Sequence, residues 1–273
     1  MTAAKPGDEF LSGEAGNVWG VRATTRALIR DARDDAVALA TGMPVRVRRA
    51  AARWPTRRVL ALAIEREGEP GLLAGARAEL ERSRHLARFA RTPAGNTGKW
   101  ENVDALLQEH PADGYDWLLV VDDDVGLPHG FLDAFVFLAE RFGLRIAQPA
   151  HRARSHAAWR VTRRRPGTVA RQTAFVESGP LVGFHASTFE TLLPFPRLRA
   201  GWGLDTHWSA IARERAWPIG VVDAIPVRHG VRRIAAAYDR VAAIEEARGF
   251  LAGRSYLSAA EAQRTLVSHR TWR

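Results

Sequence analysis

The sequence predicts an α/β protein in which a mostly parallel sheet is flanked by helices. From residue 58 onward, short apolar runs alternate with amphipathic stretches of about 10 to 15 residues, a pattern typical of strands joined by covering helices. Hydrophobic residues make up 46% of the 273 positions, which is enough to fill a sizeable core. A chain of this length suits one large α/β domain or two small ones.

The apolar runs place the elements along the chain. Strands are expected at residues 59–64, 85–90, 117–121, 144–148, 174–177 and 219–222. Helices are expected between them, at residues 71–84, 100–109, 130–142, 186–193 and 206–215. We therefore expect a main domain over residues 58–230, an N-terminal leader with a helical, basic extension over residues 1–57, and a helical tail over residues 231–273.

Two segments carry predictions of their own. Between residues 24 and 43, Leu28, Ile29, Val37 and Leu39 recur near helical spacing, so we expect a helix that packs on the main domain. Residues 151–171 contain many arginines and few apolar residues, so we expect an exposed loop that orders over a substrate.

The composition excludes several kinds of chemistry. The chain has no cysteine, which rules out disulfides, zinc–thiolate sites, iron–sulfur clusters and cysteine nucleophiles. The net charge is +10, but Lys5 and Lys99 are the only lysines among 40 basic residues, and the 38 arginines are spread along the chain. This spread favours a solvated basic surface, and no specific nucleic-acid partner is expected.

The sequence also bears on location. It has no stretch of about 18 consecutive apolar residues, and residues 1–10 lack the basic start and apolar run of a signal peptide, so we expect a cytoplasmic protein. Residues 45–58 are rich in arginine and are either an exposed linker or helix, or a surface that touches anionic lipid headgroups. The second alternative predicts peripheral contact with the inner face of a membrane.

Three adjacent carboxylates, Asp122, Asp123 and Asp124, follow the apolar run at residues 117–121. Their mutual repulsion is costly unless a cation or strong donors neutralise it, and oxygen ligands favour Mg²⁺ or Mn²⁺. In an extended chain Asp122 and Asp124 point to one side and Asp123 to the other. Glu65 and Arg91 follow two other apolar runs, and we expect them to bind a ligand at the same edge of the sheet.

The chain resembles the family 2-like glycosyltransferases of GT-A type, which have a Rossmann-like fold. The resemblance covers residues 58–230. It rests on an ordered series of loose motifs: the first apolar strand, Gly98-Lys99-Trp100-Glu101-Asn102, Asp122-x-Asp124 with Leu127-Pro128, Glu177-Ser-Gly-Pro, Gly201-Trp-Gly-Leu-Asp205 and Val227-Arg-His229. The resemblance implies that Asp124 binds the metal, that Asp122 contacts the ribose or shares the metal, and that His229 is a late ligand.

The remaining site predictions concern a nucleotide-sugar donor (UDP-, GDP- or dTDP-sugar) and a small-molecule, lipid-linked or glycan acceptor. An inverting transfer needs a general base, and Asp205 is the first candidate, with Glu177 the second. Lys99 can reach a phosphate or a nucleobase, and Asp123 belongs to the same acidic nucleotide-binding segment. Trp202, between two glycines, is expected to stack on a sugar.

Three alternatives remain open. A haloacid dehalogenase-like phosphatase also carries Asp-x-Asp after a strand, but it usually continues with Gly-Thr and needs a downstream lysine, whereas here Val125-Gly126 follows and no lysine comes later. A nucleotidyltransferase usually carries a glycine-rich loop that residues 64–70 do not resemble. A non-enzymatic, basic nucleic-acid-binding protein predicts salt-sensitive binding without metal.

Overall fold

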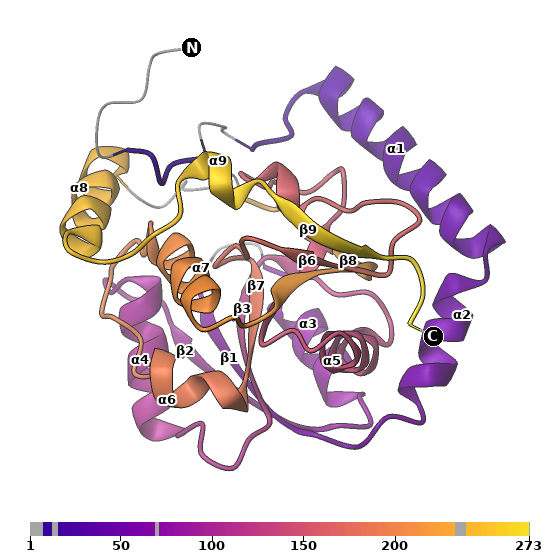
Figure 1. The fold of residues 1–273 in the computed structure, drawn as a ribbon, viewed down its shortest axis with the longest axis horizontal. Helices are drawn as coiled ribbons and strands as arrows, with labels where there is room; N and C mark the ends of the chain where they lie inside the picture. Colours follow the sequence, from indigo (N-terminus) through magenta and orange to yellow (C-terminus); the bar gives the residue numbers. More distant parts are fainter. Residues whose placement is uncertain (1–7, 13–15, 69–70, 233–238, 273) are drawn as a thin grey trace.

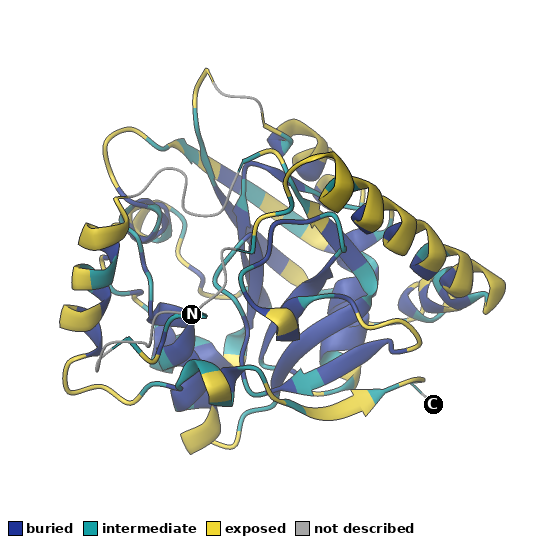
Figure 2. Cartoon of the chain, turned by 90° about the horizontal axis from the view of Figure 1, so that it is seen from above, coloured by how far each residue is buried: buried dark blue, intermediate teal, exposed yellow. Residues whose placement is uncertain are grey.

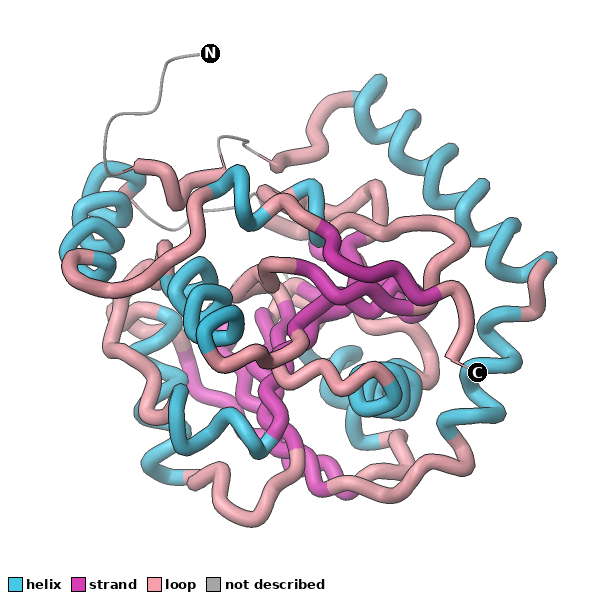
Figure 3. The backbone as a smooth tube through the Cα atoms, in the orientation of Figure 1, coloured by secondary structure: helices cyan, strands magenta, loops and turns pink. Residues whose placement is uncertain are grey.

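A computed structural model describes residues 8–12, 16–68, 71–232 and 239–272. They form a nine-stranded sheet with helices on both faces (Figures 1 and 3). The strands are β1 (Arg58–Glu65), β2 (Leu86–Pro93), β3 (Trp117–Asp122), β4 (Val125–Gly126), β5 (Ile146–His151), β6 (Ala170–Thr173), β7 (Leu181–His185), β8 (Ile219–His229) and β9 (Thr265–His269). The α-helices are α1 (Val21–Ala40), α2 (Met43–Ala51), α3 (Leu73–Glu81), α4 (Lys99–Glu109), α5 (Phe131–Arg141), α6 (Phe189–Leu192), α7 (Leu204–Glu214), α8 (Arg240–Leu251) and α9 (Ala259–Ala262), and two short 3₁₀ helices lie at Arg160–Thr162 and Ala186–Thr188.

The sheet order is β2-β1-β3-β7-β5-β8-β6-β9, and β4 pairs with β8. The α/β prediction is confirmed, but the sheet is mixed rather than mostly parallel, with three parallel and five antiparallel strand pairs. β1, β2, β3, β5 and β8 share one direction because at least one helix separates each from the next along the chain. The strands β6 and β7 are reached through loops and run the opposite way.

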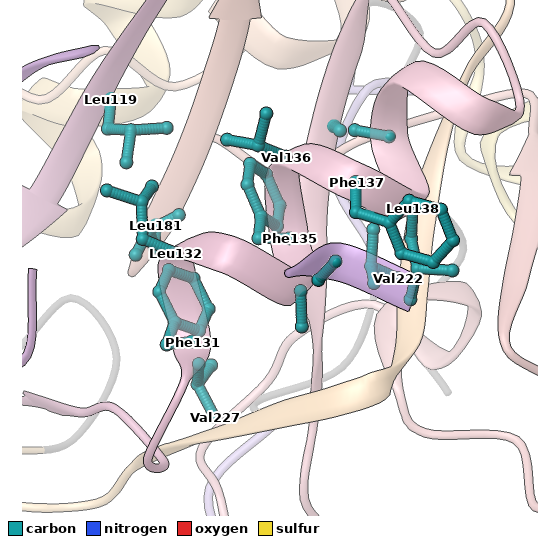
Figure 4. Close-up of a cluster of buried hydrophobic side chains, with 14 of the residues drawn as sticks. Leu119, Phe131, Leu132, Phe135, Val136, Phe137, Leu138, Leu181, Val222 and Val227 are labelled. Carbon is teal, nitrogen blue, oxygen red and sulfur yellow. The ribbon is translucent and has the colours of Figure 1, made fainter. Parts of the chain in front are cut away.

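Both faces of the central strands are buried, so side chains alternate between two cores. Val59 and Ala61 of β1 face a core that includes residues of α2, α3 and α5. Leu60 and Leu62 face the other core, with residues of α4, α6, α7 and α8. Figure 4 shows the first core, in which the side chains of α5 meet those of β3, β7 and β8.

The main strand and helix predictions are confirmed, with two corrections. The strand expected at residues 174–177 is wrong: the strand here is β6, which ends at Thr173. The exposed loop expected at residues 151–171 is also wrong, because much of this segment is buried, by apolar packing of Trp159 and Val161 and by polar contacts. Arg171 is 1% exposed and lies 2.7 Å from the Asp223 carboxylate, which also accepts from Thr168.

The terminal segments pack against the main domain more closely than the expected leader and tail would. Phe10 is 2% exposed and belongs to the second core, and Arg248 of α8 pairs with Asp8 at 2.6 Å. The C-terminal segment is helical at α8 and α9, as expected, but it ends in β9, which extends the sheet beside β6. None of the described helices is long and apolar enough to cross a membrane.

Helix α1 confirms the helix expected near residues 24–43 but reverses its packing. The residues that it buries are Ala27, Asp31, Asp34 and Ala38, whereas the expected apolar contacts Leu28, Ile29, Val37 and Leu39 are exposed. The inner face is held by hydrogen bonds from the backbone N–H groups of Ala153 and Arg154 to Asp31, and Ala38 adds apolar contact with the core. Helix α2, within the basic segment, buries Met43, Val47 and Ala51 beside α5.

Candidate functional site

The acidic residues stand at the end of a deeply buried strand, β3. Trp117 to Val121 of β3 are fully buried, Asp122 ends the strand, and Asp123 and Asp124 form the turn into β4. Asp123 and Asp124 are only 4% and 3% exposed. Because burial removes the water that would stabilise these charges, the carboxylates need partners in the protein or a bound cation.

A strand pairing brings the histidine to the acids. The two residues of β4 pair antiparallel with the end of β8, so that Val125 lies opposite His229. One ligand atom from each of Asp122, Asp124 and His229 lies within 4.8 Å of the other two. Asp122 and Asp124 lie together as expected, and Asp123 turns away, so that its Oδ2 accepts from the Arg66 backbone N–H at 2.9 Å. A turn at Asp123 and Asp124, rather than an extended strand, produces this grouping.

The hydrogen bonds of His229 limit its protonation states. Its Nδ1 lies 3.1 Å from the His156 carbonyl oxygen, which can only accept, so Nδ1 carries the hydrogen. Nε2 faces Oδ1 of Asp124 at 3.3 Å. Two acceptors would repel there, so Nε2 holds either a second proton or, as a neutral ring, a lone pair directed at a cation shared with Asp124.

The pKa values of this pair reflect the same contact. Burial lowers the pKa of His229, but the hydrogen bond and charge of Asp124 outweigh it and the pKa lies above its ordinary value. Burial also raises the pKa of Asp124, and the contacts with His229 and Arg232 outweigh it, so its pKa lies below the ordinary value. For Asp123, burial is the dominant effect and raises the pKa.

Two basic side chains reach the acidic turn. Lys99, the first residue of α4, places Nζ 2.6 Å from Oδ1 of Asp122 and donates to the Ser178 carbonyl at 2.9 Å. Arg232 pairs with Asp123, and its backbone N–H donates to Oδ2 of Asp124 at 3.2 Å. Three carboxylates against two cations leave one negative charge when His229 is neutral. A divalent ion would change this to one positive charge, which an anionic ligand could offset.

The acidic turn forms part of the wall of a cavity of about 1090 Å³. Most of the predicted site residues line it: Lys99, Asp122, Asp123, Asp124, Glu177, Trp202, Asp205 and His229. Glu65 and Arg91 do not belong to this lining. They form an ion pair with each other across β1 and β2. The nearby backbone of Arg66 takes part instead, through its bond to Asp123.

Asp205 lies in the first turn of α7. Gly203, the residue that caps this helix, has a left-handed backbone conformation. Its Oδ1 accepts from the Thr206 backbone at 2.9 Å, and the side chain is buried. Burial, together with the negative charge of Glu177, raises the pKa of Asp205 to about 7. A carboxyl group with this pKa can hold or release a proton near neutral pH.

Glu177 contacts two polar side chains of the protein. Its Oε2 lies 3.2 Å from Nε2 of the buried His151 and accepts from the Thr162 hydroxyl at 3.3 Å. The same oxygen therefore has two polar neighbours within the protein. This arrangement suits a residue that orients others and tunes the charge near Asp205.

Sequence reasoning missed Arg232 and the supporting residues His151 and His156. Arg232 follows His229 by three positions, yet nothing in the sequence separates it from the other 37 arginines. Trp202, which was predicted, lines the cavity with the Arg240 guanidinium 5.9 Å from its ring centroid.

Comparisons with known proteins add little to this geometry. No family model and no curated protein matches the chain. Among solved structures, A197 from STIV is similar to part of it, with a TM-score of 0.43 and 12% sequence identity, over 64% of this chain and 87% of that one. A similarity this weak assigns neither a family nor a function.

Proposed function

We propose that this protein is a metal-dependent, inverting glycosyltransferase of GT-A type that moves a sugar from a UDP-, GDP- or dTDP-sugar to an acceptor hydroxyl. The main support is the gathering of the Asp122, Asp124 and His229 ligand atoms within 4.8 Å on the wall of a large cavity. The same cavity contains a second, separate carboxyl group at Asp205. A metal site and a base in one cavity are what such a transfer needs.

The donor set fits Mn²⁺ or Mg²⁺. Two carboxylate oxygens and one imidazole nitrogen leave further positions for water and phosphate oxygens, which these ions commonly keep. The Nδ1–H of His229 is fixed on a backbone carbonyl, so the Nε2 lone pair is available to an ion. When bound, the ion would act as a Lewis acid that offsets the charge developing on the departing diphosphate.

Lys99 and Arg232 provide the positive charge around this position. Lys99 is 15% exposed at its side chain and lies beside Asp122, so it can shift from the carboxylate to a phosphate that enters the cavity. The guanidinium of Arg232 stays with Asp123, and its backbone N–H holds Asp124. These contacts keep the acidic turn in one conformation before the donor binds.

Asp205 is the better candidate for the base because its pKa is raised, whereas Glu177 contacts the side chains of His151 and Thr162. With a pKa of about 7, the Asp205 carboxylate can accept the proton of the acceptor hydroxyl as that oxygen bonds to the anomeric carbon. Glu177 contributes by keeping this pKa high. Trp202 offers an aromatic face for a sugar ring in the same cavity.

A donor panel tests the proposal. UDP-, GDP- and dTDP-sugars are titrated with Mn²⁺, with EDTA as the metal-free arm, and nucleotide release is measured with and without candidate acceptors. Asp124→Ala should lose metal-dependent donor binding, and Asp205→Asn should keep binding but lose transfer. Glu65→Gln, outside the cavity lining, is the matched control and should behave as wild type. If no donor binds in a metal-dependent way, the proposal fails.

One observation favours a second candidate, a phosphatase that uses Asp122 as nucleophile. Lys99 precedes the acidic motif in sequence, yet its ammonium contacts Asp122 as a phosphatase lysine would. Hydrolysis of p-nitrophenyl phosphate, abolished by Asp122→Asn and unaffected by Asp205→Asn, would support this candidate. The transferase predicts no such hydrolysis.

A further inference from the structure

Helix α1 presents its apolar side to solvent. A surface helix of a globular protein normally buries its apolar stripe and exposes its polar face. In α1 the buried positions are instead two alanines and two aspartates, Ala27, Asp31, Asp34 and Ala38. The large apolar residues are outside: Val21 is 84% exposed, Leu28 41%, Ile29 65% and Leu39 69%. Figure 2 shows this helix as mostly exposed along its length.

The outward apolar residues form a continuous stripe. At about 3.6 residues per turn, Val21, Leu28 and Leu39 project within a narrow sector of the helix, and Ile29 lies at its edge. The small, exposed Ala32 and Ala36 fill the sector between them. We refer to Val21, Leu28, Ile29 and Leu39 as the outer stripe of α1.

A row of arginines borders this outer stripe. Arg22, Arg26, Arg30 and Arg33 are all exposed and follow the same helical spacing on the side next to Ile29. The arginines Arg46, Arg48 and Arg49 of α2 are exposed as well. Along its outward side α1 therefore combines aliphatic surface with positive charge.

The acidic residues of α1 do not offset this charge on the outside. Asp31 accepts from the backbone N–H groups of Ala153 and Arg154 at 2.7 and 3.1 Å. Asp35 pairs with Arg164 at 2.7 Å and also with Arg152. Asp34 is 5% exposed. All three acids of the helix therefore face the body, and they anchor α1 with its apolar stripe outward.

We propose that α1 lies flat on the surface of an anionic lipid bilayer. The outer stripe would sit at the boundary between headgroups and acyl chains, and the arginine row would contact lipid phosphates. The exposed Trp19, just before the helix, would lie at headgroup level.

Charge complementarity favours a bilayer over the other occupants of such a surface. A second copy of the chain would place one arginine row against another, which is unfavourable. A nucleic acid would satisfy the arginines, but it would leave Leu28, Ile29 and Leu39 without an apolar partner. An anionic membrane accommodates both the charge and the apolar area.

Vesicle flotation with the full chain tests this inference. Vesicles of 70% phosphatidylcholine and 30% phosphatidylglycerol are compared with pure phosphatidylcholine, without metal or sugar nucleotide, at low and high salt. We expect binding to the anionic vesicles only, weakened by salt. Because Asp124→Ala should bind as wild type does, failure here is distinguishable from failure of the proposed transferase activity.

Paired variants separate the two parts of the surface. Ile29→Ser with Leu39→Ser should lower partitioning by about 10-fold or more, and Arg26→Gln with Arg30→Gln should lower it by about 30-fold at low salt. The matched controls are Leu86→Ser with Leu266→Ser, exposed aliphatic residues on β2 and β9, and Arg88→Gln with Arg264→Gln. The controls should bind as wild type, and melting temperatures should not change because all these side chains are exposed.

The absence of native cysteine permits a direct depth measurement. A fluorophore on Ile29→Cys should shift to the blue and be quenched by lipid-borne quenchers when anionic vesicles are added, whereas the same label on Leu266→Cys should not respond. Absence of binding, equal binding to neutral vesicles, or equal loss in the control variants would overturn the proposal. A dimer in solution that is lost in the Ile29 and Leu39 variant would also overturn it, in favour of self-association.

Discussion

Replacing Asp205 by asparagine should stabilise the protein at alkaline pH. Burial and the charge of Glu177 raise the pKa of Asp205 from 3.8 to about 7 in the folded state. An acid with a raised pKa holds its proton better in the folded than in the unfolded protein. Its contribution to stability is complete below about pH 4 and is lost as the pH rises through about 7. Above that pH the folded protein must keep a buried charge.

The magnitude follows from the two pKa values. A difference of roughly 3 units, at about 1.4 kcal/mol for each unit, gives a total of about 4 kcal/mol at high pH. Between about pH 5.5 and pH 8.5 the same linkage gives a change of about 2 kcal/mol. Asparagine keeps an oxygen for the Thr206 N–H but carries no charge, so the free energy of unfolding of the variant should not show this pH-dependent loss.

Urea unfolding of wild type and Asp205→Asn at about pH 5.5, 7 and 8.5 measures the effect. Relative to wild type, the free energy of unfolding of Asp205→Asn should rise by about 2 kcal/mol from the lowest to the highest of these pH values. Glu140→Gln is the control: burial raises the Glu140 pKa, but hydrogen bonds from Arg57, Trp117 and Trp54 outweigh it and the pKa is lowered. The change in the free energy of unfolding caused by Glu140→Gln should therefore be the same at all three pH values. Parallel curves for wild type and Asp205→Asn would refute the reasoning.

Three further predictions concern the metal, the donor and the core. Mn²⁺ at about 100 times its Kd should add about 2.7 kcal/mol to the free energy of unfolding, seen as a higher melting temperature, and Asp124→Ala should abolish this shift; a shift retained in the variant would place the ion elsewhere. Lys99→Gln should weaken donor binding about 10-fold in calorimetric titrations, because charged hydrogen bonds to phosphate are lost, and an unchanged Kd would exclude that role. Asp223→Asn should cost about 3 to 5 kcal/mol in urea unfolding, because it leaves the buried Arg171 guanidinium without a countercharge; a loss below about 1 kcal/mol would contradict this assignment.

The candidate site was predictable where local geometry determines it. A buried strand that ends in three carboxylates has few stable arrangements, and alternation in an extended chain predicts that Asp122 and Asp124 share one side. The turn at Asp123 and Asp124 produces the same grouping. His229 is different, because its approach depends on β4 pairing with β8 across about 100 residues of sequence. The order of motifs indicated it, but no local pattern did.

Other parts depend on tertiary contacts that leave little trace in the sequence. The strand β7 was missed because it is short and contains Gly183. A side chain at Gly183 would come within 2.8 Å of Leu119 and 3.0 Å of Phe135, so glycine is required for α5 to pack closely on the sheet. Arg171 was expected in an exposed loop because charged residues are usually exposed, but it is buried as an ion pair with Asp223.

Helix α1 shows the limit of periodicity most clearly. Helical spacing indicates which residues share a face, and it grouped Leu28, Ile29 and Leu39 correctly, but spacing does not indicate whether that face meets the core. Asp31 and Asp35 determine which face of α1 is buried. Their hydrogen bonds and ion pairs with residues 152–164 hold the face opposite the apolar residues against the body of the protein. Removing both carboxylates, by Asp31→Asn with Asp35→Asn, should therefore loosen α1 from the body, which faster amide hydrogen exchange across residues 21–40 would reveal. Unchanged exchange would mean that packing by Ala27 and Ala38 alone orients the helix.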